Sequence, residues 1–371
     1  MPFEPKTAFP GLLADSAARV AQDLAAAYPK PADPAVIAEM GWNAVLIPEA
    51  LGGFGGEFAD LASIVEALAL QATDLPIITR CGVVPAMLAA LADGARAQAL
   101  LTSCAEGAVV LELGGPLSAS DAVAPLALAR ADSDGGAHHV TGKTVEMPWT
   151  EDCTHVLLVC ADVDDGTPML ACVDADRLRK HGGGAVFQTM DEVRVCVCEV
   201  HDLPLADDDV LASGADAKGA LDAGWRVAVA ATATDTVCAM SSVLGRTITY
   251  LLERQQFGQP LAQFQALRHD VARLYVSYEI CRSLLQATLR EMAASPAVQH
   301  NAGAFDLLGM YTSEAAIDYA ETVIQLHGGM GMTREMPAAR LATRLLANAM
   351  RFGDTLSHRQ SLNRLRTRTA P

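Results

Sequence analysis

Two hydrophobic periods divide the chain into segments. In the first 107 residues, apolar side chains recur at the spacing of an amphipathic helix, as in the run from Leu12 to Leu24. A glycine-rich loop between Gly52 and Gly56 interrupts this pattern, because paired glycines break helices. Residues 1–107 are therefore predicted to form an N-terminal helical domain.

The pattern changes at about Val109, where short β-branched runs alternate with clusters of Gly, Asp and Pro. The runs are VVLELGG, HHVTGK, THVLLVCADV, PMLACVDA and VRVCVCEV. Short strands separated by turn signals are typical of an antiparallel β-domain. Their number predicts a small barrel or sandwich over residues 108–213.

After residue 213 the helical period returns and continues to the end of the chain. A long helix is predicted from near Ala217 towards Glu253. A later helix stops at Gly328–Gly329, since glycine accepts the left-handed conformation found at helix ends. Residues 214–371 are predicted to form a C-terminal helical bundle, so the fold is mainly α with a central β-domain.

Composition narrows the possible functions. The 371-residue chain is 51% apolar and only 5% aromatic, which suits helix packing with small residues at the contacts. Its net charge of -17 argues against a nucleic-acid partner, because a phosphate backbone would be repelled. The N-terminus lacks a basic segment followed by an apolar run, and no apolar stretch is long enough to span a bilayer. We therefore expect a soluble, cytoplasmic protein without a membrane partner.

The nine cysteines are odd in number and scattered, and only Cys196 and Cys198 lie close in sequence. At two-residue spacing in a predicted strand, both side chains point to one face of the sheet. Metal sites bring more ligands together than this, so no metal site is expected. Reduced, partly buried thiols are the better interpretation.

Two motifs in the C-terminal segment have the most specific chemistry. They are RQQFGQPL at residues 254–261 and QLHGGMG at residues 325–331. An arginine offers several donors to phosphate oxygens, and glycine permits close backbone approach to a ligand. Taken singly, Arg254 also fits a solvated arginine at a helix end, and Gly328–Gly329 fits a simple helix stop.

Together the two motifs resemble the signatures in the C-terminal domain of the acyl-CoA dehydrogenases. The segment MGWNAVLIPE at residues 40–49, with the glycines that follow it, is similar to another segment of this family. The resemblance covers nearly the whole chain and implies the family's N-terminal helical domain, middle β-barrel and C-terminal four-helix bundle. It also implies FAD as the cofactor, an acyl-CoA substrate and an electron-transfer acceptor.

The resemblance gives roles to the residues of both motifs. In the family, the motif arginine reaches across a subunit interface to the FAD pyrophosphate, and this role falls to Arg254. The phenylalanine that packs against the dinucleotide corresponds to Phe257, and Gln256 lies where a side chain meets FAD. Gln325 and Gly328–Gly329 match the segment that lines the adenosine half.

The catalytic base is the main departure from the family. The reaction needs a carboxylate of raised pKa near the α-carbon of the thioester. The resemblance places the usual glutamate at Phe352, and the position that a minority of the family uses at Trp225. Neither side chain can act as this base, so no catalytic residue is assigned. Asp354 is a weaker candidate, because an aspartate in a loop or helix cap is the simpler interpretation.

The middle domain departs from the family as well. The family covers the flavin with a tryptophan, whose position falls here on Glu146 or Met147. Pro148 removes a backbone donor, and Trp149 can substitute only in a shifted loop. The Thr-Glu-Pro segment that meets the flavin is replaced by ELGGP at residues 112–116.

The chain keeps the FAD-binding motifs but lacks the base and the flavin-covering residues. This combination predicts that two different chains form one active site. Some bacterial members of the family, notably those acting on steroid side chains, resemble α2β2 heterotetramers in which FAD lies between unlike subunits and one subunit carries the base. This chain resembles the other subunit, which contributes FAD-binding residues to a homologous partner. The alternatives are a self-sufficient homotetramer with a displaced base such as Asp354, a flavin-free assembly protein, and a flavin-dependent monooxygenase, which needs no α-proton base.

Overall fold

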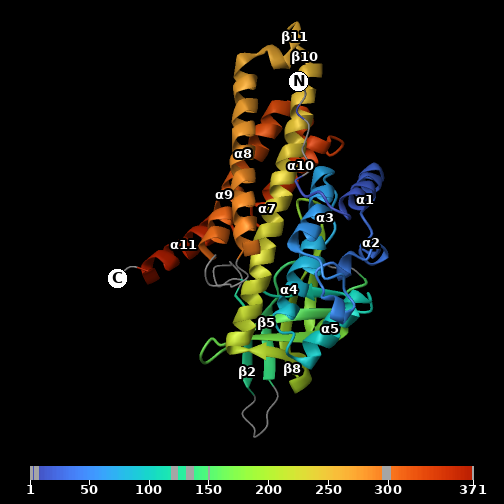
Figure 1. Ribbon diagram of the computed structural model, residues 1–371, viewed down its shortest axis with the longest axis vertical. Helices are drawn as coiled ribbons and strands as arrows, with labels where there is room; N and C mark the ends of the chain where they lie inside the picture. The colour runs from blue at the N-terminus through green and yellow to red at the C-terminus, as the bar shows by residue number, and fades with distance from the viewer. Residues whose placement is uncertain are drawn as a thin grey trace. The chain divides into compact units, whose positions relative to one another are not determined.

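The computed structural model describes residues 3, 8–117, 124–130, 138–148, 151–294 and 302–369 (Figure 1). Packing groups the chain into two compact units. The bundle unit comprises Met1–Ala32, Ala62–Leu75 and Val229–Pro371, and the sheet unit comprises Asp33–Leu61 and Pro76–Ala228. The N-terminal helices are thus divided between the two units, and the three-part division of the sequence stays a prediction.

Helices fill the N-terminal segment, as its hydrophobic period predicts. They are α1 (Ala14–Ala26), α2 (Ala35–Glu39), α3 (Phe58–Leu70), α4 (Val84–Ala89) and α5 (Ala95–Ala105), with the 3-10 turns η1 (Trp42–Ala44) and η2 (Glu49–Leu51) and the π-helix η3 (Ile78–Val83). The predicted glycine loop lies between η2 and α3. A Cβ atom at Gly53 would lie 2.0 Å from the carbonyl oxygen of Ile47, so this backbone contact requires glycine.

The middle of the chain forms one sheet of nine described strands. They are β1 (Leu111–Leu113), β2 (Leu126–Arg130), β3 (His138–Lys143), β4 (Met147–Pro148), β5 (His155–Asp162), β6 (Pro168–Asp174), β7 (Gly182–Gln188), β8 (Arg194–Leu205) and β9 (Val210–Ser213), with α6 (Ala175–Lys180) after β6 and η4 (Asp207–Asp209) after β8. Their order is β4-β8-β3-β2-β5-β6-β9, with β1 beside β5 and β7 beside β8. Pairing is antiparallel except that β1 and β2 each run parallel to β5. The central β-domain is confirmed, although the described strands pair along an open path and do not close into a barrel.

One face of this sheet is buried in a single apolar core. Alternate residues of β5, namely Val156, Leu158 and Cys160, point into it, as the two-residue period of a strand requires. The sulfur atoms of Cys196 and Cys198 lie 3.5 Å apart in the same core, which confirms that they share a face. All nine cysteines are free thiols.

The C-terminal region confirms the predicted helical bundle. Its elements are α7 (Gly214–Glu253), β10 (Gln255–Gln256), β11 (Gln259–Pro260), η5 (Leu261–Gln263), α8 (Gln265–Ala294), α9 (Ala302–His327), η7 (Gly328–Met332), α10 (Pro337–Asn348) and α11 (Thr355–Thr369). From Val229 onwards, α7 packs with α8, α9 and α10 around a core that includes Met240, Leu274, Tyr319 and Leu345 (Figure 1). The most apolar part of α7 has the length and composition of a membrane span, but it is completely buried, so α7 is a core helix.

Candidate functional site

The first motif forms a hairpin at the end of α7 (Figure 1). Arg254 is held there by its backbone. Its N–H donates to the carbonyl oxygen of Tyr250 at 2.8 Å, and its own carbonyl oxygen accepts from the N–H of Leu261 at 2.9 Å. The side chain of Arg254 is exposed. The hairpin therefore fixes the backbone of this long residue and leaves its guanidinium exposed to solvent.

Phe257 occupies the tip of the hairpin in a strained and exposed position. Its φ is +54°, a left-handed conformation that costs a non-glycine residue roughly 1 kcal/mol or more. The side chain is 90% exposed, and its ring makes an edge-to-face contact with Phe264 at 6.0 Å between centroids. Gln256, beside it, is exposed as well. A large aromatic surface that is held in solvent at this energetic cost is typical of a contact made with another molecule.

The second motif ends α9 and opens its backbone to solvent. Gln325 lies exposed on the last turn of the helix, and both Gly328 and Gly329 are exposed in η7. Gly328 has a φ of +57°, and a Cβ atom at either glycine would meet nothing within 4 Å. Gly331 has the opposite role, because a Cβ atom there would lie 2.7 Å from a backbone oxygen of α9. The first two glycines therefore leave the backbone free for close approach by a ligand.

Tyr250 and His327 bring the two motifs together. The hydroxyl of Tyr250 donates to the carbonyl oxygen of His327 at 3.3 Å, and the two rings stack with centroids 4.5 Å apart. Sequence reasoning missed both residues. The one signal available was position, since Tyr250 precedes Arg254 by about one helical turn and His327 directly precedes Gly328.

The exposed groups of the two motifs fit the diphosphate and adenosine parts of a dinucleotide. A guanidinium binds phosphate oxygens through paired hydrogen bonds, and an open glycine backbone permits close contact. A phenyl ring such as that of Phe257 packs against a flat aromatic group. Ligand sites are concave, however, and a projecting hairpin covers a ligand without enclosing it.

The described loop between α10 and α11 holds no carboxylate of raised pKa. Phe352 is half-buried with a φ of +57°, and its ring cannot accept a proton. The Oδ1 atom of Asp354 accepts from the N–H of Ser357 at 2.8 Å and from its hydroxyl at 2.6 Å, so Asp354 caps α11. These hydrogen bonds lower the pKa of Asp354 below its ordinary value. Trp225, at the other family position, is half-buried on α7.

At the positions that the structure describes, the sheet unit does not present the flavin-facing side chains that the family uses. Met147 is completely buried and belongs to the core of the sheet, so its side chain cannot cover a flavin. Glu146 is exposed, and Trp149 lies outside the described residues. In the replaced ELGGP segment, a Cβ atom at Gly115 would lie 2.4 Å from the side chain of Val159. This segment is packed tightly on the sheet.

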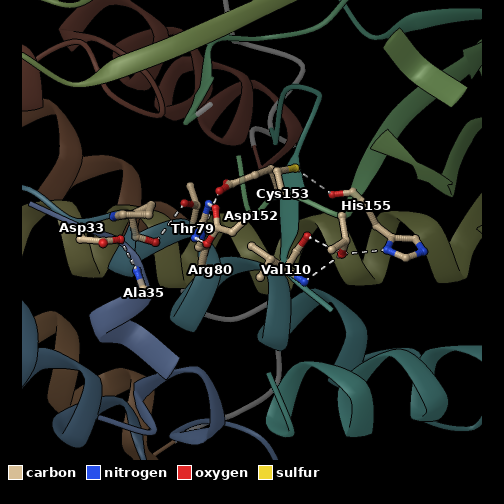
Figure 2. Close-up of polar contacts among 11 residues, drawn as sticks. Asp33, Ala35, Thr79, Arg80, Val110, Asp152, Cys153 and His155 are labelled. Atoms are coloured by element: carbon tan, nitrogen blue, oxygen red, sulfur yellow. Dashed lines mark hydrogen bonds and ion pairs between the residues drawn. The ribbon is translucent and has the colours of Figure 1, made fainter. Parts of the chain in front are cut away.

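An ion cluster holds the first residue of that segment, Glu112, which is buried together with the Arg80 side chain, while Asp152 is exposed. Arg80, on η3, contacts the Glu112 carboxylate through Nε and bonds to Asp152 at 2.8 Å and 3.2 Å; Figure 2 shows Arg80 and Asp152. Glu112 is completely buried, and burial raises its pKa to about 7. Loss of hydration outweighs the attraction of Arg80, and the negative charge of Asp152 raises the pKa further. The cluster fastens the π-helix to β1 and keeps this carboxylate away from the surface.

This cluster predicts a specific pH dependence of stability. The folded-state pKa of Glu112 is raised from 4.5 to about 7, so its contribution to stability is complete below 4.5 and is lost as pH rises through 7. We expect the melting temperature of the wild type, relative to that of Glu112→Gln, to decrease across this interval and to level off above it. Glu146→Gln, which changes an exposed carboxylate, serves as the control. A wild-type advantage that grows with pH would contradict the raised pKa.

Comparisons with known proteins agree with the two motifs. Residues 219–364 match the family described as "Acyl-CoA dehydrogenase, C-terminal domain". The protein "Acyl-CoA dehydrogenase IpdE2" of Mycolicibacterium smegmatis is 26% identical over 301 residues, which cover 80% of this chain and 75% of that protein.

Two solved complexes contain chains of the same fold. A chain of the ChsE4-ChsE5 complex from Mycobacterium tuberculosis matches 98% of this chain and 99% of its own length with a TM-score of 0.79 and 18% identity. A chain from a variant of the Tcur3481-Tcur3483 steroid ACAD matches 96% and 97% with a TM-score of 0.78 and 23% identity. At these identities the likeness concerns the fold, and it confirms the predicted order of helices, β-domain and helices.

Proposed function

Because the chain belongs to the acyl-CoA dehydrogenase family of FAD-dependent oxidoreductases, we propose that it is the subunit of a heteromeric acyl-CoA dehydrogenase that completes the FAD site of a homologous partner. In this assembly an acyl-CoA thioester is dehydrogenated between its α- and β-carbons. The partner chain carries the glutamate that removes the α-proton. This chain supplies groups that bind FAD.

One contrast carries the proposal. The two motifs of the bundle unit that we assign to FAD are exposed, with Arg254 fixed at its backbone and open space beside Gly328–Gly329. The position of the usual base, in the same unit, holds Phe352, and the nearby Asp354 is a helix cap of lowered pKa. A chain with this combination binds the cofactor without being equipped to take the α-proton.

The proposal assigns a separate task to each group. Bound FAD supplies the acceptor for the β-hydride. Arg254 neutralises charge on the diphosphate, and the ring of Phe257 packs against the dinucleotide. Gln256 and Gln325 offer amide donors and acceptors, and Gly328–Gly329 lets the backbone approach the adenosine half. All of these residues bind and orient FAD, and none of them moves a proton.

Two further observations support an assembly of unlike chains. Both solved relatives are complexes named for two different chains. In addition, large apolar side chains on α8 and α9 are between 39% and 56% exposed, namely Tyr275, Val276, Ile280, Leu307 and Tyr311. Apolar groups gathered on two packed helices are typical of a surface that a partner covers.

The acyl group in this proposal is bulky and of steroid type. One relative is named as a steroid ACAD, which supports this choice. Comparing turnover of a steroid side-chain CoA thioester with turnover of straight-chain acyl-CoA thioesters tests it. Faster turnover of the straight-chain substrates would refute the steroid assignment and leave the subunit role intact.

A self-sufficient homotetramer is the second candidate. Asp354 favours it, because this carboxylate lies only two residues from the usual base position. The cap that Asp354 forms on α11 and its lowered pKa argue against it, since an α-proton base needs a raised pKa.

Expression of the chain alone and with a homologous partner that carries the glutamate separates these candidates. The proposal expects colourless or unstable protein from the chain alone. The co-purified complex is expected to bind FAD at about half the number of its chains and to be reduced by acyl-CoA. Yellow protein from the chain alone, with one FAD per chain and reduction by acyl-CoA, would establish the homotetramer. A stable, colourless protein under both conditions would show a flavin-free role.

Substitutions at Asp354 test the base directly. In the complex, Asp354→Asn is expected to leave turnover within about twofold of wild type, because asparagine still caps a helix and the base lies in the partner. Asp354→Ala should lower the free energy of unfolding by about 1 kcal/mol through loss of the cap. A turnover loss of about a thousandfold in Asp354→Asn, near 4 kcal/mol of barrier, would identify Asp354 as the base.

A further inference from the structure

Tyr250 contacts both FAD-binding motifs at once. Its carbonyl oxygen accepts the N–H of Arg254 at 2.8 Å. Its hydroxyl donates to the carbonyl oxygen of His327 at 3.3 Å, and its ring stacks on the imidazole at 4.5 Å with 24° between the ring planes. Tyr250 therefore meets the hairpin through its backbone, and through its side chain it meets the residue from which the Gly328–Gly329 turn departs.

His327 is built to receive this contact. It is the last residue of α9, where carbonyl groups have no partner within the helix, and the Tyr250 hydroxyl satisfies its carbonyl oxygen. The imidazole is 3% exposed, and burial lowers its pKa, so the ring is neutral at physiological pH. Its Nδ1 lies 2.9 Å from the carbonyl oxygen of Val323, which fixes the ring plane against which Tyr250 stacks.

We propose that Tyr250 is a positioning residue that sets the distance and angle between Arg254 and the Gly328–Gly329 turn. Recognition of a dinucleotide by two separate segments requires both to be held to within about 0.5 Å of the productive geometry. The two segments lie 77 residues apart along the chain between Tyr250 and His327, and this contact joins them directly. The inference rests on the proposed function, because it concerns the same FAD-binding surface.

The chain contains a matched control for the loss of this hydroxyl. Tyr319, on α9, is also a tyrosine that links α7 and α9, and its hydroxyl donates to the carbonyl oxygen of Met240 at 3.2 Å. It is buried in the bundle core, and Met240 lies well before the hairpin in sequence. Tyr319→Phe therefore removes the same kind of hydrogen bond without touching either motif.

The test compares FAD affinity and melting temperature in whichever assembly retains FAD. Release of flavin on dilution, followed by its fluorescence, gives the affinity. Tyr250→Phe keeps the ring stack and is expected to weaken FAD binding by about 3- to 10-fold, as one neutral hydrogen bond allows. Tyr250→Leu, which loses the stack as well, should weaken it by about a further 3-fold or more. Tyr319→Phe should lower the melting temperature and leave FAD affinity unchanged.

Arg254→Ala, measured beside these variants, separates failure of this inference from failure of the proposed function. If Arg254→Ala weakens FAD binding while Tyr250→Phe and Tyr250→Leu do not, the positioning role is refuted and the FAD-binding role stands. Equal weakening by Tyr250→Phe and Tyr319→Phe would show general destabilisation and also refute it. If Arg254→Ala leaves FAD affinity unchanged, the proposed function itself fails.

Discussion

Replacing Arg254 by alanine is expected to weaken FAD binding by the assembled enzyme by about 10- to 100-fold, which corresponds to a charged hydrogen bond of about 1.5–3 kcal/mol. The Arg254 side chain is exposed, while its backbone is held by Tyr250 and Leu261. The substitution therefore removes the guanidinium without disturbing the hairpin. Equilibrium flavin release from the purified complex measures the effect.

Two variants make this result specific. Arg254→Lys keeps the positive charge but loses the planar fork that binds two phosphate oxygens, so its affinity should fall between those of the wild type and Arg254→Ala. Arg290→Ala removes another exposed arginine, from α8, and should leave FAD affinity unchanged. Because the Arg254 side chain is exposed, Arg254→Ala should not change the melting temperature of the flavin-free chain. Equal losses of affinity in Arg254→Ala and Arg290→Ala would show a general charge effect and no phosphate contact.

The largest expected effect on stability comes from Arg344, which lies on α10 in the interior of the bundle unit. Its Nε donates to Asp235 of α7 at 2.7 Å, and a second nitrogen donates to the carbonyl oxygen of Thr73 at 2.9 Å. Asp235 is 1% exposed and also accepts from Asn348 at 2.6 Å. Arg344→Met leaves the Asp235 carboxylate buried without its counter-ion. We expect the free energy of unfolding to fall by about 3–5 kcal/mol.

A double variant separates loss of the pair from loss of packing. Arg344→Met combined with Asp235→Asn removes both charges, so it should be more stable than Arg344→Met alone. Urea unfolding followed by circular dichroism provides the comparison. If the single and double variants unfold at the same urea concentration, the buried charge is not the cause of the loss.

The spacing of apolar residues along the chain predicted the architecture, because each spacing corresponds to one type of secondary structure. Helical spacing buries one face of a helix, and alternation buries one face of a strand, so the order of helices, sheet and helices was readable. Gly328 has a positive φ, so the helix stop predicted there marks a real change of backbone direction. Whether the strands close into a barrel could not be predicted in this way, because strand order depends on partners that are distant in sequence.

The candidate site, too, could be predicted from the sequence only in part. Arg254 and Phe257 could be predicted as site residues because they belong to one contiguous motif, and the structure leaves both exposed. Asp354 remained ambiguous, since a carboxylate near the base position fits either a base or a cap. Its hydrogen bonds to Ser357 and the resulting lowered pKa favour the cap.

Sequence by itself therefore determined the resemblance to the acyl-CoA dehydrogenases, the periodic elements and the absence of a carboxylate at the positions of Phe352 and Trp225, because these depend on residues close together along the chain. Only the tertiary structure decided which distant groups meet. The contact of Tyr250 with His327 and the pairing of Arg80 with Glu112 each join segments that are distant in sequence. Burial sets the energetic weight of such contacts, and burial is a property of the packed chain.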